Sequence, residues 1–188
     1  RALAHLFDVD GAIENIHNGL LTRVVGPVLP SMLGYDENLP LIEFSIEKAK
    51  ALLKEVGWED TNDDGIVDKI INGGRTELSV DLSYVAQSQT QQAMGLLFKE
   101  DALKAGVNVE LVGKESIAHR EDLSNRNFDM IQHGVGIPTP SIYDPKQSWH
   151  TASDVPGGGN HSGFGNAEMD ALIDEIRVTL DEEKRAAL

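Results

Sequence analysis

Hydrophobic positions along the chain recur with two periods, one typical of strands and one typical of helices. Apolar and polar residues alternate over residues 77–84, which predicts a strand with one wetter face. Further strands are predicted over residues 107–112 and over the mostly apolar residues 128–135. Helical periodicity predicts helices over residues 88–105 and 116–125, so the expected order is β-α-β-α-β.

Strands that alternate with helices of this length favour a parallel sheet with right-handed crossovers. The apolar centres of the predicted strands fit burial on both faces of such a sheet. The pattern therefore predicts the α/β fold class, built mainly of parallel β-α-β units plus loops. The proline-rich residues 26–40 and the glycine- and proline-bearing residues 136–165 are predicted to be loops.

Polar residues stand where several predicted helices begin. Ser45 and Asn166 each precede an amphipathic stripe, and Asp10 is predicted to cap a short first helix. Ser88, with Gln91 three residues later, predicts a capping box. The stripe after the capping box consists of Ala93, Met94, Leu97 and Leu103, and the stripe of the last long helix consists of Met169, Leu172, Ile173, Ile176 and Leu180.

Charge and composition exclude several classes of partner and site. The chain has 31 Asp and Glu residues against 16 Lys and Arg, and its formal net charge is -15 at pH 7. This charge repels phosphate backbones and anionic lipid, so neither nucleic acid nor a membrane surface is an expected partner. The absence of Cys excludes a disulfide scaffold, a thiolate zinc site and a cysteine nucleophile. No apolar run approaches the ~18 residues of a membrane-spanning helix, so we expect no direct membrane insertion.

Both ends of the chain are predicted to be helical, without the signals that usually bound a helix. Residues 1–7 have no cap before them, and residues 180–188 have no stop signal. A length of 188 residues predicts one domain, or one domain plus an extension. We therefore expect residues 1–188 to form a single truncated domain of a longer protein.

Residues 60–68 match part of a calcium-binding loop, in which oxygen ligands alternate along the chain and a glycine allows a sharp turn. The match covers positions 1, 3, 5, 6 and 9, but position 12 is Ile71 instead of a bidentate Glu. The candidate metal ligands are Asp60, Asn62, Asp64 and Asp68. The alternative interpretation is an Asx-rich turn without a metal. Calcium is the one cofactor that the sequence suggests, and no other is expected.

The sequence contains no recognisable set of catalytic residues. The six His residues are scattered, without an HExxH helix or a short pair at ligand spacing. The glycines at 157–159 and 163–165 do not form a phosphate-binding motif, and no Gly-x-Ser-x-Gly elbow occurs. We therefore expect that the protein is not an enzyme.

The segment that leaves the third predicted strand is the best candidate for contact with a ligand. In open α/β sheets, ligands lie beyond the carboxyl ends of the strands. Gly134, Val135 and Gly136 lie there, where a ligand could approach the backbone closely. Tyr143 and Trp149 could stack on a sugar or an apolar group. The alternative for Trp149 is that it anchors the loop to the core.

A series of short motifs runs through nearly the whole chain. The motifs are Arg1-Ala-Leu-Ala-His-Leu-Phe-Asp8, Gly26-Pro-Val-Leu-Pro30, Gly34-Tyr-Asp36, Glu47-Lys-Ala-Lys-Ala-Leu-Leu53 with Gly57-Trp58, Asp60-Thr-Asn62 with Asp64-Gly65, Phe128-Asp-Met130, Tyr143-Asp-Pro145, and Gly163-Phe-Gly-Asn-Ala-Glu-Met-Asp-Ala-Leu-Ile173. In order and spacing, the chain resembles the family 5 extracellular solute-binding proteins, which are the peptide, nickel and oligosaccharide receptors of bacterial ABC importers.

This resemblance implies a C-terminal lobe of a periplasmic-binding-protein-like (type II) fold, with the larger preceding lobe absent. It also implies that the two lobes close by hinge motion on a small-molecule or peptide solute and deliver the solute to an ABC permease. The implied location is periplasmic or at the cell surface of a bacterium or archaeon. Residues 60–65 would then form a turn that needs no metal.

One departure from the family bears on the solute. In peptide-binding relatives, an Asp shortly before the Asp/Glu-Pro step meets the peptide amino terminus, and the matching residue here is Ser141. A Ser cannot neutralise a buried ammonium, which favours an oligosaccharide or another neutral solute over a generic peptide. The expected ligand-binding residues are His133, Gly134, Val135, Gly136, Ile137, Ser141, Tyr143 and Trp149. The alternative function is a calcium-stabilised interaction or adhesion module that uses residues 60–68.

Overall fold

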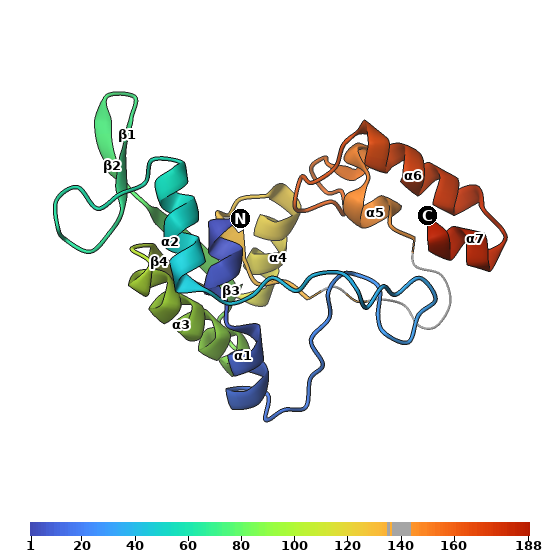
Figure 1. Cartoon of the computed structure of the whole chain (residues 1–188), viewed down its shortest axis with the longest axis horizontal. Helices are drawn as coiled ribbons and strands as arrows, with labels where there is room; N and C mark the ends of the chain where they lie inside the picture. The colour runs from blue at the N-terminus through green and yellow to red at the C-terminus, as the bar shows by residue number, and fades with distance from the viewer. Residues whose placement is uncertain (135, 137–143) are drawn as a thin grey trace. The chain divides into compact units, whose positions relative to one another are not determined.

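The computed structural model describes residues 1–134, 136 and 144–188 (Figure 1). The chain divides into two compact units. The first unit comprises Arg1–Arg23, Leu41–His119 and Phe128–His133. The second unit comprises Val24–Pro40, Arg120–Asn127 and Gly134–Leu188. The expectation of a single truncated domain over residues 1–188 stays a prediction.

The first unit contains a three-stranded sheet with the strand order β4-β3-β5. Its central strand β3 (Ser79–Val85) is parallel to both β4 (Asn108–Lys114) and β5 (Met130–Ile131). The short pairing with β5 places Leu82 beside Met130. The predicted α/β fold class, with parallel β-α-β units, is therefore confirmed.

Strand β5 covers only two residues of the strand that was predicted over residues 128–135. Just before it, a side chain takes the place of a backbone partner: the Asp81 amide donates to Asp129 Oδ2 at 3.0 Å. Just after it, the Gln132 amide still donates to the Ser83 carbonyl oxygen at 2.9 Å. The ladder along β3 is thus longer than the two residues of β5, but it uses a side chain at one end.

Four helices lie in the first unit and one crosses from it into the second. They are η1 (Ala2–Leu6), α1 (Val9–Asn15), α2 (Ile46–Glu55), α3 (Gln89–Lys104) and, crossing between the units, α4 (Ser116–Asn125). Each of Ser45, Ser88 and Asn166 accepts the backbone amide three residues further on, as predicted for caps. The prediction for Asp10 is wrong, because α1 begins one residue before Asp10 and is capped by Asp8.

The structure also contains an antiparallel hairpin that the periodicity did not predict. Its strands are β1 (Asp68–Ile71) and β2 (Gly74–Glu77), joined by Asn72 and Gly73. The φ angles of Asn72 and Gly73 are 51° and 81°. Two positive φ angles are what a type I′ turn requires, and Asn-Gly is its preferred sequence. Because β2 is exposed along its whole length, it shows no alternation of buried and exposed positions.

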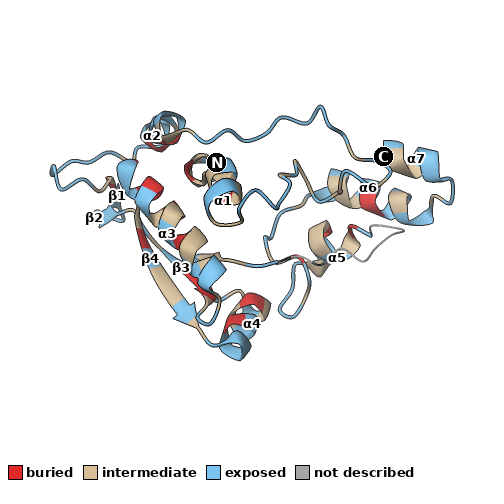
Figure 2. Cartoon of the chain, turned by 90° about the horizontal axis from the view of Figure 1, so that it is seen from below, coloured by how far each residue is buried: buried red, intermediate tan, exposed pale blue. Residues whose placement is uncertain are grey.

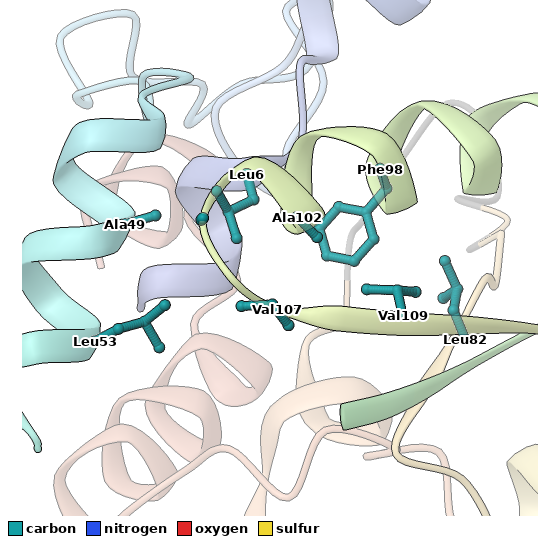
Figure 3. Packing of buried hydrophobic residues seen from close by; sticks show 9 residues of the cluster. Leu6, Ala49, Leu53, Leu82, Phe98, Ala102, Val107 and Val109 are labelled. Atoms are coloured by element: carbon teal, nitrogen blue, oxygen red, sulfur yellow. The ribbon is translucent and has the colours of Figure 1, made fainter. Parts of the chain in front are cut away.

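The core of the first unit is a cluster of buried apolar side chains from η1, α2, α3 and the sheet (Figure 3). Its buried members are Leu6, Ala49, Leu53, Leu82, Phe98, Ala102, Ala105, Val107 and Val109. Figure 2 shows buried positions on α2, α3, β3 and β4. On α3, Phe98 is 3% exposed, whereas Leu103, which was predicted on the inward stripe, is 54% exposed. The buried face of α3 therefore differs from the prediction at its carboxyl end.

The second unit consists of short helices joined by loops. These helices are α5 (Lys146–Trp149), η2 (Thr151–Ser153), α6 (Ala167–Val178) and α7 (Glu182–Ala187). Ile173 of α6 is 3% exposed, as its place on the predicted stripe requires, but Leu180 is 92% exposed because it lies beyond the end of α6. In the part of the chain that the structure describes, no helix is both long enough and apolar enough to cross a membrane.

Candidate functional site

The carboxyl ends of β3, β4 and β5 lie along one edge of the sheet because the three strands are parallel. Polar residues follow each strand at this edge. The Gln87 side chain, which follows β3, donates to Glu115 Oε2, which follows β4, at 2.6 Å. The Ala86 amide donates to the Lys114 carbonyl oxygen at 2.9 Å. These hydrogen bonds join the carboxyl ends of β3 and β4, at the same edge of the sheet from which the chain leaves β5.

Two glutamines fix the point at which the chain leaves β5. Gln91 Oε1 accepts the Val85 amide at 2.8 Å, so Gln91 does not complete the predicted capping box with its side chain. Gln132 Nε2 donates to the Gln91 carbonyl oxygen at 2.8 Å. A Cβ at Gly95 would lie 3.1 Å from Gln132 Nε2, so this glycine lets α3 pack closely against Gln132. The sequence analysis did not single out Gln132, because a polar residue at a strand end carries no pattern of its own.

The predicted ligand-binding residues that follow Gln132 are only partly described. His133 is exposed and belongs to the first unit, and Gly134 and Gly136 are exposed and belong to the second. Among the described residues, a Cβ at either glycine would meet nothing within 4 Å, so packing against this part of the chain does not require glycine there. Close approach of a ligand to this backbone stays a prediction. Val135, Ile137, Ser141 and Tyr143 lie outside the described residues.

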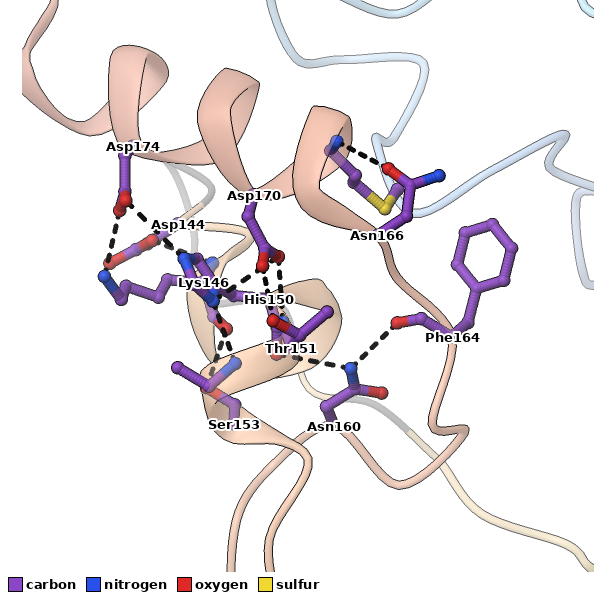
Figure 4. Close-up of polar contacts among 12 residues, drawn as sticks. Asp144, Lys146, His150, Thr151, Ser153, Asn160, Phe164, Asn166, Asp170 and Asp174 are labelled. Carbon is purple, nitrogen blue, oxygen red and sulfur yellow. Dashed lines mark hydrogen bonds and ion pairs between the residues drawn. The ribbon is translucent and has the colours of Figure 1, made fainter.

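Trp149 lies at the carboxyl end of α5 in the second unit and is half-buried. Its ring meets the Phe164 ring edge-on, with centroids 6.4 Å apart and planes at 85°. Phe164 is 59% exposed. The side chain of the fully buried Asn160 donates to the Phe164 carbonyl oxygen at 2.8 Å and to the His150 carbonyl oxygen at 3.3 Å (Figure 4). The two aromatic rings therefore sit on backbone that is fixed by a buried amide, and Phe164 is a candidate contact that the sequence analysis missed.

The calcium-like loop uses its side-chain oxygens to bind its own backbone. Asp60 Oδ2 accepts the Gly65 amide at 2.9 Å. Asp64 Oδ1 accepts the Ile66 amide at 2.9 Å, and this bond, followed by one from Asn62, holds the pKa of Asp64 below its ordinary value. This arrangement is that of an Asx-rich turn.

Asp68 closes the same loop through hydrogen bonds to Thr61. It is 2% exposed, and it accepts the Thr61 amide at 3.0 Å and the Thr61 hydroxyl at 2.8 Å. Arg75 Nη1 lies 4.0 Å from Asp68 Oδ2. Within residues 1–134, 136 and 144–188, no group of three or more His, Asp or Glu side chains is arranged to hold a metal ion. Calcium binding by Asp60, Asn62, Asp64 and Asp68 stays a prediction.

Comparison with known proteins identifies relatives over the whole length of the chain. The oligopeptide-binding protein AppA of Bacillus subtilis is 27% identical over 189 residues, and the nickel-binding periplasmic protein of Escherichia coli is 30% identical over 197 residues. The alignments cover 98% and 100% of this chain but only 33% and 35% of those proteins. The chain thus spans about a third of the length of these relatives.

Solved structures show the same fold. The structure of AppA in complex with a nonapeptide matches with a TM-score of 0.88 at 26% identity, covering 99% of this chain and 36% of AppA. The mannohexaose-bound periplasmic protein of Thermotoga maritima matches in fold, with a TM-score of 0.84 at 20% identity and coverage of 100% of this chain and 37% of that one. The expected periplasmic-binding-protein (type II) fold is therefore confirmed.

The family model for bacterial extracellular solute-binding proteins, family 5 Middle, matches residues 1–156. This range includes the whole parallel sheet, both glutamines at its carboxyl edge, and Trp149. The chain therefore belongs to the family 5 bacterial extracellular solute-binding proteins.

Proposed function

We propose that this chain is a solute-binding lobe of an ABC importer receptor, which captures an oligopeptide, an oligosaccharide or a similar small solute. The observation that carries this proposal is the family match over residues 1–156. A second lobe of the same parent chain would close on the solute by hinge motion, and the loaded receptor would deliver the solute to a permease. Capture and release break no covalent bond, so the proposal includes no enzymatic step.

The proposed contact surface begins where the chain leaves β5. His133, Gly134 and Gly136 are exposed there, and Gln132 is the last residue held by the sheet. The region beyond the carboxyl ends of parallel strands is where ligands lie in open α/β sheets. The remaining proposed contacts are Val135, Ile137, Ser141 and Tyr143, which lie outside the described residues, and Trp149.

Two observations favour a neutral solute such as an oligosaccharide. Ser141 stands where the resemblance to peptide-binding relatives implies an Asp that meets the peptide amino terminus, so no carboxylate occupies that position. The exposed Phe164 ring beside Trp149 also suits stacking on the apolar face of a sugar ring. AppA is solved with a nonapeptide and the Thermotoga protein with mannohexaose, so these two molecules are suitable probes.

The proposed location is the periplasm or the cell surface of a bacterium or archaeon, because the family consists of extracellular proteins. A net charge of -15 gives no basis for a nucleic-acid partner. The oxygens of Asp60 and Asp64 accept amides of their own loop, which favours the receptor over the alternative of a calcium-stabilised adhesion module.

Titration calorimetry of the full-length receptor with the nonapeptide and with mannohexaose tests this proposal. We expect measurable binding of mannohexaose, with weaker binding of the nonapeptide. Trp149→Ala should weaken the binding by about tenfold if the ring stacks on the solute, whereas Trp149→Phe should retain most of the affinity. An unchanged dissociation constant in a stably folded Trp149→Ala receptor would show that Trp149 only anchors its loop.

A further inference from the structure

His150 lies between two carboxylates of α6 in the second unit (Figure 4). It follows Trp149 at the end of α5 and is 8% exposed. Its Nδ1 is 3.4 Å from Asp170 Oδ1, and its Nε2 is 3.5 Å from Asp174 Oδ2. A buried imidazole with a carboxylate at each ring nitrogen is a place where a single proton changes the local balance of charges.

The hydrogen bonds of His150 define its neutral form. His150 Nδ1 accepts the Ala152 amide at 3.0 Å. A backbone amide can only donate, so Nδ1 carries no proton in this arrangement, and the proton of the neutral ring lies on Nε2, which faces Asp174. The bond from Ala152 also caps the first turn of η2, the short helix that follows.

Protonation of the ring changes this pattern. A protonated Nδ1 is a donor, so it cannot accept the Ala152 amide, and its nearest acceptor is Asp170 Oδ1. The two partners of Nδ1 therefore exclude one another. The neutral ring closes the start of η2, and the charged ring pairs with both carboxylates of α6 and releases the Ala152 amide.

The carboxylates are held in place from α5 and η2. Asp170 accepts the Thr151 amide at 2.9 Å and also the Thr151 hydroxyl, and these bonds, the hydroxyl's first, hold the pKa of Asp170 below its ordinary value. The Lys146 ammonium donates to Asp174 Oδ1 at 2.9 Å and in the same way lowers the pKa of Asp174. Both carboxylates consequently stay ionised over the pH range in which an imidazole ordinarily gains its proton.

Two further charges complete the surroundings of the cluster. Asp144 Oδ1 accepts the Lys146 amide at 3.0 Å, and Asp144 Oδ2 accepts from Arg177 Nε of α6 at 3.1 Å. Helix η2 has no ionisable side chain. Asp144 is also the first described residue after the gap, three positions beyond Ser141 in the sequence. These bonds tie Asp144 and α5 to α6.

We propose that His150 is a proton-sensitive positioning residue. The neutral ring accepts the Ala152 amide at the start of η2, and the protonated ring releases this amide and pairs with Asp170 and Asp174 of α6. The switch itself depends only on contacts within the second unit. Its effect on the neighbouring Trp149, a proposed ligand contact, rests on the proposed function. Acidification across the range in which an imidazole ordinarily gains its proton should loosen the segment that begins at Ala152.

Hydrogen exchange of the solute-free, full-length receptor, measured by mass spectrometry and corrected for the intrinsic effect of pH, tests the switch. Protection of the Ala152 amide should fall about fivefold between pH 8 and pH 5.5, the effect of losing one ordinary hydrogen bond. In His150→Asn, the side-chain oxygen can still accept this amide but cannot be protonated, so protection should no longer depend on pH. His17→Asn removes an imidazole from the first unit and serves as the matched control, with the pH dependence of the wild type.

A second variant keeps the test decisive if His150→Asn perturbs folding. Asp170→Asn can still accept the Thr151 amide but removes the anion nearest to Nδ1, so protection of Ala152 should persist to lower pH than in the wild type. Wild-type protection that stays constant from pH 8 to pH 5.5, or an Asp170→Asn profile identical to that of the wild type, would overturn the proposal. Because no solute is present, neither outcome depends on whether the chain has the proposed receptor function.

Discussion

The two units of this chain differ in the kind of contact that stabilises each of them internally. The first is built on nine buried apolar residues that join η1, α2, α3 and the sheet. Among the described residues of the second, only five are buried, and two of these are polar: Leu123, Pro145, His150, Asn160 and Ile173. The first unit also buries the polar side chains of Asp68, Ser83, Asp101 and His119, but it has an apolar cluster, and apolar burial is insensitive to protons. The second unit has few buried apolar side chains and relies more on hydrogen bonds and ion pairs, which respond to pH. In the second unit, His150 directly follows Trp149, one of the proposed ligand contacts.

The 188-residue chain has two tryptophans, which make this comparison measurable when the chain is studied by itself. Trp58 packs against the core of the first unit, and Trp149 belongs to the second. In a Trp149→Phe background, fluorescence reports unfolding of the first unit, and in a Trp58→Phe background it reports the second. The unfolding free energy of each unit can then be followed in urea.

The largest effect is expected from Phe98→Ala in the core of the first unit. Phe98 is 3% exposed, and removal of its ring should lower the unfolding free energy by about 3–5 kcal/mol. Urea unfolding in the Trp149→Phe background measures this loss. Leu96→Ala, at a position of the same helix that is 54% exposed, is the control and should cost about 0.5 kcal/mol. Equal losses for the two variants would mean that the core is not where the structure places it.

A smaller effect is expected from Asn160→Ala in the second unit. The Asn160 amide is buried and serves the carbonyl oxygens of His150 and Phe164, so its removal leaves acceptors without a donor. The unfolding free energy reported by Trp149 should fall by about 1–3 kcal/mol, with no change in the signal from Trp58. Asn38→Ala, an exposed position in the same unit, should have little effect. A loss shared by both reporters would show that the two units unfold as one.

The smallest effect is expected on how the unfolding free energy of the second unit falls with decreasing pH. The folded-state pKa of Asp170 is lowered, chiefly by the Thr151 hydroxyl, so its contribution to stability is fully present above the pKa of the unfolded Asp, about 3.9, and is lost as pH falls through the folded value. Stability of the second unit should therefore decline below about pH 4. Asp170→Asn should flatten this decline, and Glu168→Gln, exposed at the start of the same helix, provides the control. An identical pH dependence of the unfolding free energy in wild type and Asp170→Asn would show that Asp170 does not cause the decline.

Periodicity and caps predicted the parts of the fold that are governed by local rules. Ser45, Ser88 and Asn166 were identified because a side-chain oxygen before an apolar stripe satisfies helix amides wherever the helix packs. The parallel strands followed from the β-α-β order. The hairpin over residues 68–77 was missed because its strands have no buried apolar face to impose alternation: Asp68 is buried, but Ile70 and Ile71 are exposed, and so is all of β2. Its Asn-Gly turn was visible in the sequence.

Contacts between residues distant in sequence could not be predicted from the pattern. Gln91 serves the Val85 amide and not the cap, and Gln132 reaches a carbonyl oxygen 41 residues away. The scattered His residues have no ligand spacing in the sequence, yet Asp170 and Asp174, four residues or about one helical turn apart on α6, lie at the two ring nitrogens of His150. Such pairings depend on how helices dock, which a single sequence does not encode locally. Of the candidate ligand contacts, His133, Gly134, Gly136 and Trp149 are described, and their roles stay predictions.

The most direct test of the central claim is native mass spectrometry of the full-length receptor, purified without denaturation. We predict a retained small molecule whose mass is that of a neutral oligosaccharide or a similar solute and which is lost on unfolding. A retained peptide would keep the receptor function and contradict the inference from Ser141. A receptor that carries no solute and binds neither mannohexaose nor the nonapeptide would contradict the proposed function.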